Sequence, residues 1–141
     1  MRVERSVIYK FCKKEVNLEC TDLFFFDDFV ISQMHEASVY DRDAAYSIIF
    51  AISNFYPEDK PFHYISNRIH DYSINPVDLK WFLELFPAMQ SYHVVFYESP
   101  SKSHLELESL FAPIPIVAHE QLIQALDALL LPQHRISKYK R

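Results

Sequence analysis

Apolar and polar residues alternate along the chain with two periods, one typical of strands and one typical of helices. Between residues 3 and 19 the apolar positions recur roughly every second residue, which predicts one or two strands with one face covered. Two apolar runs, at residues 23–26 and 29–31, flank Asp27 and Asp28. Because aspartate tolerates a positive φ better than most residues, we expect these runs to form a tight hairpin.

Downstream of the hairpin, segments with helical spacing alternate with short apolar runs. Apolar side chains in residues 42–56 recur every three or four positions between Asp41, a helix cap, and Pro57, a helix breaker, so a helix is expected there. The same two patterns predict the later elements: strands at 61–66, 91–97 and 114–117, a polar helix at 102–110, and a last helix containing Leu122, Ala125, Leu126 and Leu129.

The helix that follows residues 61–66 has the clearest start in the sequence. Asn75 can cap it with its side chain, and Pro76 suits the first helical position, where an N–H group has no partner within the helix. The apolar residues behind them recur at i, i+3, i+4 and i+7 and therefore share one face: Leu79, Phe82, Leu83 and Phe86. We expect Phe82 and Leu83 to be buried.

This order of elements predicts an α/β fold with an N-terminal β-hairpin, then alternating helices and strands, and a mixed central sheet with covering helices. The length of 141 residues suits a single domain, which we place at residues 1–131. Residues 132–141 hold four of the fourteen basic residues and few apolar ones, so we expect a disordered basic tail.

Composition excludes several chemistries. The chain has no glycine, so it cannot build the glycine loops of Walker nucleotide sites, dinucleotide-binding folds or nucleophile elbows. The net charge is −5, and the four basic residues of the tail leave ten against nineteen acidic residues in the rest of the chain. Such a body should repel nucleic acid.

The sequence also indicates where the protein works. There is no apolar run long enough for a transmembrane helix and no leader pattern, so we expect a soluble, cytoplasmic protein. Cys12 and Cys20 lack the spacing of a metal or redox motif and are too few for a disulfide framework. We expect them to be reduced strand residues; a bridge between them is the alternative.

One polar cluster lies between the strand at 61–66 and the next helix: Ser66, Asn67, Arg68, Asp71, Tyr72 and Ser73. In α/β sheets the carboxyl end of a strand and the amino end of a helix commonly bind ligands, and free N–H groups there attract anions. The cluster therefore predicts a small-anion, phosphoserine or partner-docking site. The alternative is that Asn67 and Asp71 satisfy loop backbone groups and Arg68 pairs with an acidic neighbour.

Histidines offer a weaker signal. His35 and Glu36 could form an acid/base pair, and His63, His70 and His93 fall in or near neighbouring strands, but no ligand pair has zinc spacing. The segment starting at His119 begins like H-E-x-x-H and has isoleucine in place of the second histidine. We therefore expect no metal, no cofactor and no catalytic residues, and an enzyme is only the third interpretation of function.

The helix after Asn75 carries a second apolar stripe, made by Val77, Trp81 and Leu85 at intervals of four residues. A single sheet can cover only one stripe, so this one must meet a neighbouring helix or a partner chain. If the stripe meets a partner chain, we expect a twofold homodimer with Trp81 at its centre, since twofold pairs are the commonest assemblies.

Several of these segments together resemble bacterial STAS-like (SpoIIAA-like) domains. The resemblance spans about residues 21–130. It includes the hairpin that leads to residues 32–36, the long first helix, the strand end Tyr-Ile-Ser-Asn-Arg at 64–68, the Tyr-Ser-x-Asn-Pro helix start at 72–76, and Phe-Ala-Pro-Ile-Pro at 111–115. It implies a STAS-like fold and a regulatory role through binding another protein.

What the resemblance implies about a site centres on Ser73. In anti-sigma-factor antagonists a serine at the start of the second helix is phosphorylated by a partner kinase, and Ser73 is the nearest match in position. SpoIIAA-like domains also resemble lipid-transfer modules of the CRAL-TRIO type, which implies a small apolar ligand as the alternative function. A carrier of that kind would need a cavity, which we would expect among the many phenylalanines.

Overall fold

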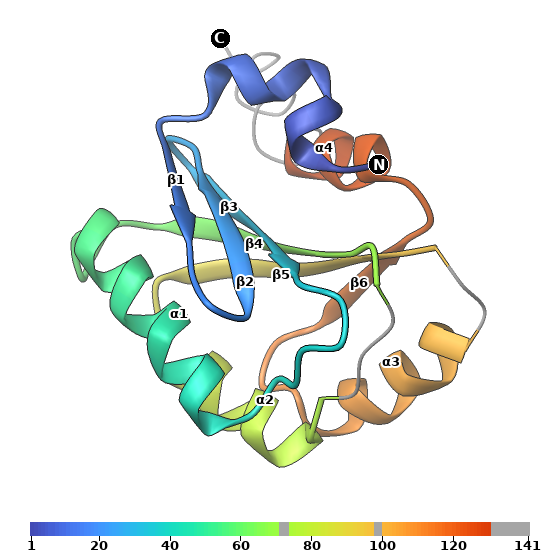
Figure 1. The fold of residues 1–141 in the computed structure, drawn as a ribbon. Helices are drawn as coiled ribbons and strands as arrows, with labels where there is room; N and C mark the ends of the chain where they lie inside the picture. Colours follow the sequence, from blue (N-terminus) through green and yellow to red (C-terminus); the bar gives the residue numbers. More distant parts are fainter. Residues whose placement is uncertain (71–73, 98–99, 131–141) are drawn as a thin grey trace, which may run out of the picture.

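The structure, a computed structural model, describes residues 1–70, 74–97 and 100–130 (Figure 1). Two short 3₁₀ helices come first, η1 (Val3–Arg5) and η2 (Val7–Phe11). The strands of the described residues are β1 (Lys14–Asn17), β2 (Thr21–Phe25), β3 (Phe29–Met34), β4 (Phe62–Arg68), β5 (Met89–Phe96) and β6 (Ile116–His119). The α-helices of the same residues are α1 (Arg42–Phe55), α2 (Pro76–Glu84), α3 (Pro100–Phe111) and α4 (Leu122–Leu130).

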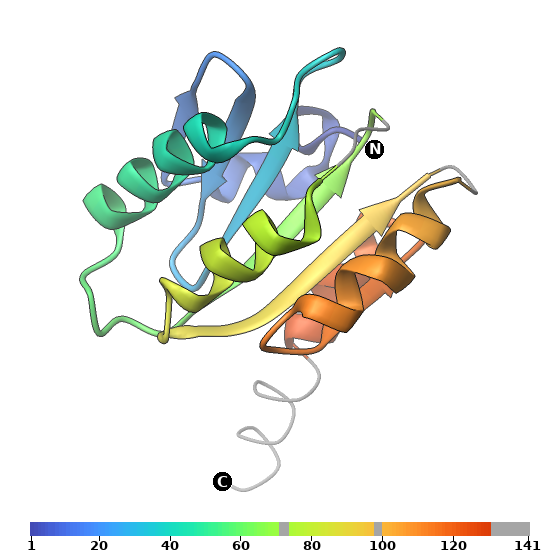
Figure 2. The same ribbon diagram turned by 90° about the horizontal axis from the view of Figure 1, so that it is seen from below.

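All six of these strands form one mixed sheet in sequence order, from β1 to β6. β1, β2 and β3 pair antiparallel, whereas β3, β4, β5 and β6 pair parallel. Right-handed crossovers between successive neighbouring strands place every crossover helix on one face, and Figures 1 and 2 show α1, α2 and α3 side by side there. The expected α/β order of hairpin, then alternating helices and strands, is confirmed.

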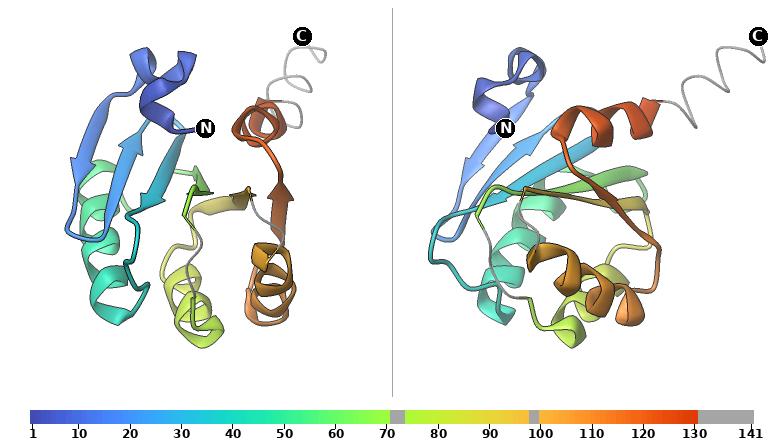
Figure 3. Two further views of the ribbon diagram at one scale, coloured as in Figure 1. Left: turned by 45° about the vertical axis from the view of Figure 1, so that its right-hand side comes forward. Right: turned by 90° about the vertical axis from the view of Figure 1, so that its right-hand side faces the viewer.

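The opposite face of the sheet is covered by η1, η2 and α4 (Figure 3). The sheet therefore buries both faces, with one apolar core under α1–α3 and a smaller one under α4. Side chains of a strand alternate between the two cores. In β4, for example, Tyr64 belongs to the α1–α3 core and Ile65 belongs to the α4 core.

Helix α2 begins as its sequence predicts. The Asn75 side-chain oxygen accepts a hydrogen bond from the backbone N–H of Val77 at 2.9 Å, and Pro76 occupies the first helical position. Leu79, Phe82 and Leu83 are buried. Both the cap and the apolar phase of α2 are therefore confirmed.

The N-terminal segment differs from expectation, because residues 3–11 form 3₁₀ turns and strand pairing starts only at Lys14. Both the backbone N–H and the hydroxyl of Ser6 donate to the Val3 carbonyl, at 2.9 and 2.7 Å. Val3 is fully buried, whereas Val7 is exposed. The prediction of a strand at the start of this segment was wrong because local turns, anchored by Val3, satisfy its backbone groups.

The hairpin between β2 and β3 forms, but without the expected backbone conformation. The Phe26 N–H donates to the Phe29 carbonyl at 2.8 Å across the turn. Asp27 and Asp28 both keep negative φ, and among the described residues only Ala37 has a positive φ, of 63°. The predicted hairpin is confirmed, and its turn closes without a positive φ at either aspartate.

The cysteines and two strand boundaries also differ from the predictions. Cys12 and Cys20 are free thiols, as expected, but neither lies in a strand. β6 starts two residues later than predicted, at Ile116, because Pro115 has no N–H to donate to a neighbouring strand. β4 extends two residues further than predicted and ends at Arg68.

Candidate functional site

The polar cluster predicted after β4 lies partly in the strand itself. Because β4 continues to Arg68, the residues Ser66, Asn67 and Arg68 alternate between the two faces of the sheet, and all three are buried. Ser66 and Arg68 face the α1–α3 layer, and Asn67 faces the opposite side. The other members of the cluster, Asp71, Tyr72 and Ser73, lie outside the described residues, so the docking site stays a prediction.

Arg68 forms a buried ion pair with Glu108 of α3. Its Nη1 donates to Oε2 at 2.9 Å and its Nη2 donates to Oε1 at 2.6 Å, while Nε donates to the Ser66 hydroxyl oxygen at 3.3 Å. Both charged side chains are only 2 % exposed. Arg68 thus has the acidic partner that the second interpretation of the cluster expects. An incoming anion would have to compete with the Glu108 carboxylate.

Asn67 holds the start of the chain against the opposite face of the sheet. Its Nδ2 donates to the backbone carbonyl of Met1 and to Oε1 of Gln33 in β3, both at 2.9 Å. Its Oδ1 accepts a hydrogen bond from the hydroxyl of Tyr97 at 2.7 Å. Burial raises the pKa of Tyr97 to about 12 despite this hydrogen bond, so the tyrosine is a neutral donor at physiological pH.

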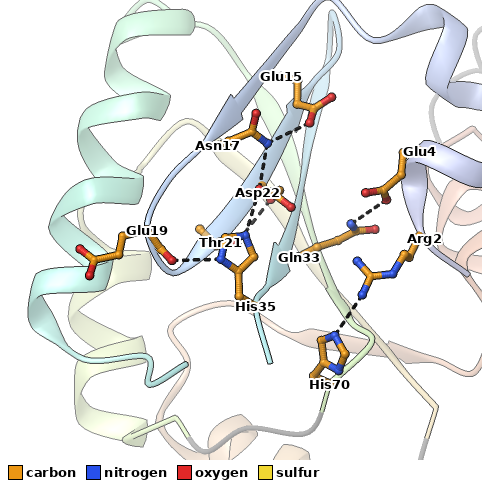
Figure 4. A network of polar contacts seen from close by, with 10 residues as sticks. All are labelled: Arg2, Glu4, Glu15, Asn17, Glu19, Thr21, Asp22, Gln33, His35 and His70. Carbon is orange, nitrogen blue, oxygen red and sulfur yellow. Dashed lines mark hydrogen bonds and ion pairs between the residues drawn. The ribbon is translucent and has the colours of Figure 1, made fainter. Parts of the chain in front are cut away.

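Gln33 extends the same network into the 3₁₀ segment. Its Oε1 also accepts from the backbone N–H of Val3 at 2.7 Å, and its Nε2 donates to the Glu4 carboxylate at 3.1 Å. Figure 4 shows this contact beside that of Arg2, whose Nη2 lies 3.1 Å from Nε2 of His70. These bonds fix the N-terminal segment to β3 and to the residues after β4.

His35 pairs with the carboxylate of Asp22. Its Nε2 lies 3.0 Å from the Asp22 carboxylate, and its Nδ1 lies 3.0 Å from the Glu19 carbonyl (Figure 4). The hydrogen bond with Asp22 raises the pKa of His35. The alternative of an acid/base pair between His35 and Glu36 finds no support in this geometry, because the imidazole of His35 is bonded to Asp22.

Three histidines and a serine form a chain of hydrogen bonds across β4, β5 and β6, under α4. Ser91 Oγ lies 2.6 Å from Nδ1 of His63 and 2.9 Å from Nε2 of His93. Nδ1 of His93 in turn lies 2.9 Å from Nε2 of His119, and their rings stack at 5.2 Å. His63 and His93 were expected in or near neighbouring strands, whereas neither His119 nor Ser91 was connected with them. The only feature of the local sequence that points to this hydrogen-bond chain is that Ser91 and His93, two residues apart in a strand, share a face.

All three hydrogen bonds in this chain can form while every imidazole is neutral. The protons then point in one common direction, either from His119 toward His63 or the reverse, because a neutral imidazole has one donor and one acceptor. Burial, with His119 and His63 close by, lowers the pKa of His93 to about 4. Burial also lowers the pKa of His119. The arrangement suits neutral histidines and the transfer of a proton along the chain.

We predict that this chain of hydrogen bonds makes the stability of the folded protein sensitive to mild acid. A histidine whose pKa falls from 6.5 to about 4 on folding binds fewer protons than in the unfolded chain, so stability is lost as pH falls from 6.5 toward 4. The loss from His93 should be about 2 to 3 kcal/mol at pH 4. Urea unfolding of wild type and His93→Gln at pH 7 and pH 4 measures it. The wild type should lose that much more stability than the variant; equal losses would contradict the prediction.

The second apolar stripe of α2 lies on the outside of the helix layer. Val77 is 54 % exposed and Leu85 is 45 % exposed. Trp81 is half-buried, because the Arg42 guanidinium lies 4.2 Å above its ring and the Tyr46 ring contacts its edge at 5.2 Å. The predicted interface residues therefore lie together on one accessible face. Neighbouring helix α1 covers part of Trp81 through Arg42 and Tyr46.

A cleft of about 400 Å³ lies on the other face of the sheet, between the 3₁₀ segment and α4. Its apolar lining includes Val7, Ile8, Leu122, Ile123 and Leu126, and no phenylalanine is among the described residues that line it. The aromatic rings of the main core instead pack on one another, as do Tyr64, Phe82 and Phe86. This cleft could not be expected from local sequence patterns, because its walls come from residues far apart in the chain.

Comparisons of the chain with protein-family models, with curated proteins and with solved structures found no match. Within residues 1–70, 74–97 and 100–130, no group of three or more histidine, cysteine, aspartate or glutamate side chains could hold a metal ion. The same residues contain no helix that is both long and apolar enough to cross a membrane. The findings therefore define an α/β fold with a mixed six-stranded sheet, and they define no family.

Proposed function

We propose that this protein is a non-catalytic interaction module that binds a second copy of itself through the outer face of α2. The observation that carries the proposal is the outer stripe of α2, in which Val77 and Leu85 are exposed and Trp81 is half-buried. Contiguous exposed apolar residues that include a tryptophan commonly mark protein interfaces. A stripe of this kind on a folded domain favours an interaction module over an internal structural helix.

The stripe is self-complementary, which favours a second copy as the partner. Val77 and Leu85 lie four residues before and four residues after Trp81, so an antiparallel twofold pair centred on Trp81 matches each Val77 with the Leu85 of its mate.

The resemblance to STAS-like domains supports a regulatory role for such a module. The capped start of α2, which carries part of that resemblance, sits directly beside the proposed interface. Ser73 precedes Asn75 by two residues, so a phosphate on it would lie close to the positive end of the α2 dipole. Phosphorylation of Ser73, and docking through the segment after β4, belong to this proposal as its regulatory part.

Sedimentation of wild type and Val77→Asp at tens of micromolar tests the interface. We expect the wild type to dimerise and the variant to be a monomer, because the charge would be desolvated against the Leu85 of the mate. Val77 is the second residue of α2, where an aspartate is compatible with the helix dipole, so the variant should keep its fold.

Ile123→Asp is the matched control for this experiment. Ile123 is 52 % exposed, close to the 54 % of Val77, and it is likewise the second residue of its helix, α4. It lies on the opposite face of the sheet, so this variant should dimerise like the wild type. A monomeric wild type, or a Val77→Asp protein that still dimerises, would refute the proposed interface.

A further inference from the structure

The cleft between the 3₁₀ segment and α4 has the size and lining of a small-ligand site. Its volume of about 400 Å³ lies within the range of roughly 300 to 1,000 Å³ that is usual for such sites. Val7 and Ile123, from opposite walls, are both largely exposed, although an isolated domain would gain from burying them. Tyr97 and Leu122 add further lining.

One wall of the cleft is held in place by the buried hydrogen bonds already described. Asn67 binds the backbone carbonyl of Met1, which lines that wall, and Gln33 binds the backbone N–H of Val3, two residues before the lining residue Arg5. Tyr97 lines the cleft and also donates to Asn67. The cleft is therefore preformed by a satisfied polar network, and a ligand would not have to order its wall on binding.

The charge at the cleft is positive. Arg5 lines it and, among the described residues, makes no ion pair. The acidic residues of the two walls, Glu4, Glu120 and Asp127, are not among the residues that line it. Residues 1–14 as a whole carry five basic side chains and one acidic side chain, in a chain whose net charge is −5. A basic group beside an apolar cleft favours a ligand that is itself amphipathic and anionic.

We propose that this cleft binds a single alkyl chain with an anionic head group, as in a free fatty acid. The chain lies against Val7, Ile123 and Leu126, and the carboxylate lies at Arg5, whose planar guanidinium suits that group. The volume is at the low end of the usual range, which favours one chain over a two-chain lipid. This site is on the opposite face of the sheet from the proposed dimer interface and goes beyond it.

Titration calorimetry with decanoate, below its micelle concentration, tests the proposal, with decyltrimethylammonium as a ligand of equal chain length and opposite charge. We expect saturable one-to-one binding of decanoate and much weaker binding of the cation. Arg5→Gln should lower the decanoate affinity about three- to tenfold, as for a partly exposed charge pair. Ile123→Asp should lower it at least roughly tenfold, because it places a carboxylate against the chain.

Val77→Asp is the matched control and should bind decanoate like the wild type. Val77→Asp tests the dimer interface and is the control here, whereas Ile123→Asp tests this site and is the control for the dimer. Failure of this site and failure of the dimer interface can therefore be distinguished. Equal binding of decanoate and the cation, wild-type binding by Ile123→Asp, or no saturable binding would overturn the proposal. Sedimentation with vesicles of phosphatidylcholine and phosphatidylserine adds one more outcome. Vesicle binding that Ile123→Asp abolishes, without decanoate binding, would assign this face to a lipid surface and would also overturn it.

Discussion

Replacing Glu108 with alanine should destabilise the protein by about 3 to 5 kcal/mol, because it leaves the Arg68 guanidinium buried without its carboxylate. The two side chains share two short hydrogen bonds and are each only 2 % exposed. Taking a charge out of water is costly, and the opposite charge offsets that cost only while both are present. The free energy of unfolding, measured in urea for wild type and Glu108→Ala, gives this loss directly.

The double variant Arg68→Met with Glu108→Leu separates the cost of an orphaned charge from the value of the pair. It removes both charges and keeps apolar volume, so it should recover most of the stability that Glu108→Ala loses. Asp28→Ala is the surface control. It breaks the exposed pair with Lys60, at 3.2 Å, and should cost no more than about 1 kcal/mol. If Glu108→Ala costs no more than Asp28→Ala, the pair contributes nothing as a buried unit.

The fold could be predicted from the sequence wherever a residue's structure depends mainly on its neighbours in the chain. Asn75 and Pro76 specify a helix start regardless of the rest of the chain, and the spacing of Leu79 and Phe82 then specifies which face is buried. In the same way, parallel strands joined by helices leave little freedom in topology, because the crossovers are right-handed.

The candidate site could not be predicted to the same extent, because its contacts join distant parts of the chain. In α3, expected from the sequence as a polar helix, Leu105 and Glu108 are buried while Leu107, Leu110 and Phe111 are exposed. The buried carboxylate of Glu108 is the partner of Arg68, forty residues away in the sequence. No periodicity within α3 carries that information.

The hydrogen-bonded histidines and the cleft could not be predicted from the sequence for the same reason. Ser91 and His93 share a face by strand alternation, but only the register between β4, β5 and β6 brings His63 and His119 to them. At the N-terminus, two-residue alternation from Val7 to Tyr9 resembled a strand, whereas the anchoring of Val3 by Gln33 decided the structure. A local pattern therefore fails where one long-range contact outweighs it.

Replacing Phe82 with alanine should also cost about 3 to 5 kcal/mol, the usual penalty for emptying a fully buried phenylalanine site. Phe82 is 0 % exposed, and its ring meets the rings of Tyr40, Tyr64 and Phe86 edge-on at 5.5 to 6.1 Å. Each such pair contributes beyond the area that it buries, by about 0.5 to 1.5 kcal/mol. These neighbours come from different elements and cannot all move into the vacated volume, so a cavity should remain.

Phe11→Ala is the matched control, since it makes the same substitution at a side chain in η2 with 62 % exposure. It should change the free energy of unfolding by no more than about 0.5 kcal/mol, as is usual for surface positions. Urea unfolding of both variants at neutral pH measures the difference between them. A Phe82→Ala protein only as destabilised as Phe11→Ala would mean that the α2 face named from the sequence does not form the centre of the core under α1–α3. A large loss for Phe82→Ala alone would show that the i, i+3, i+4 spacing of α2 determines how this helix joins the sheet.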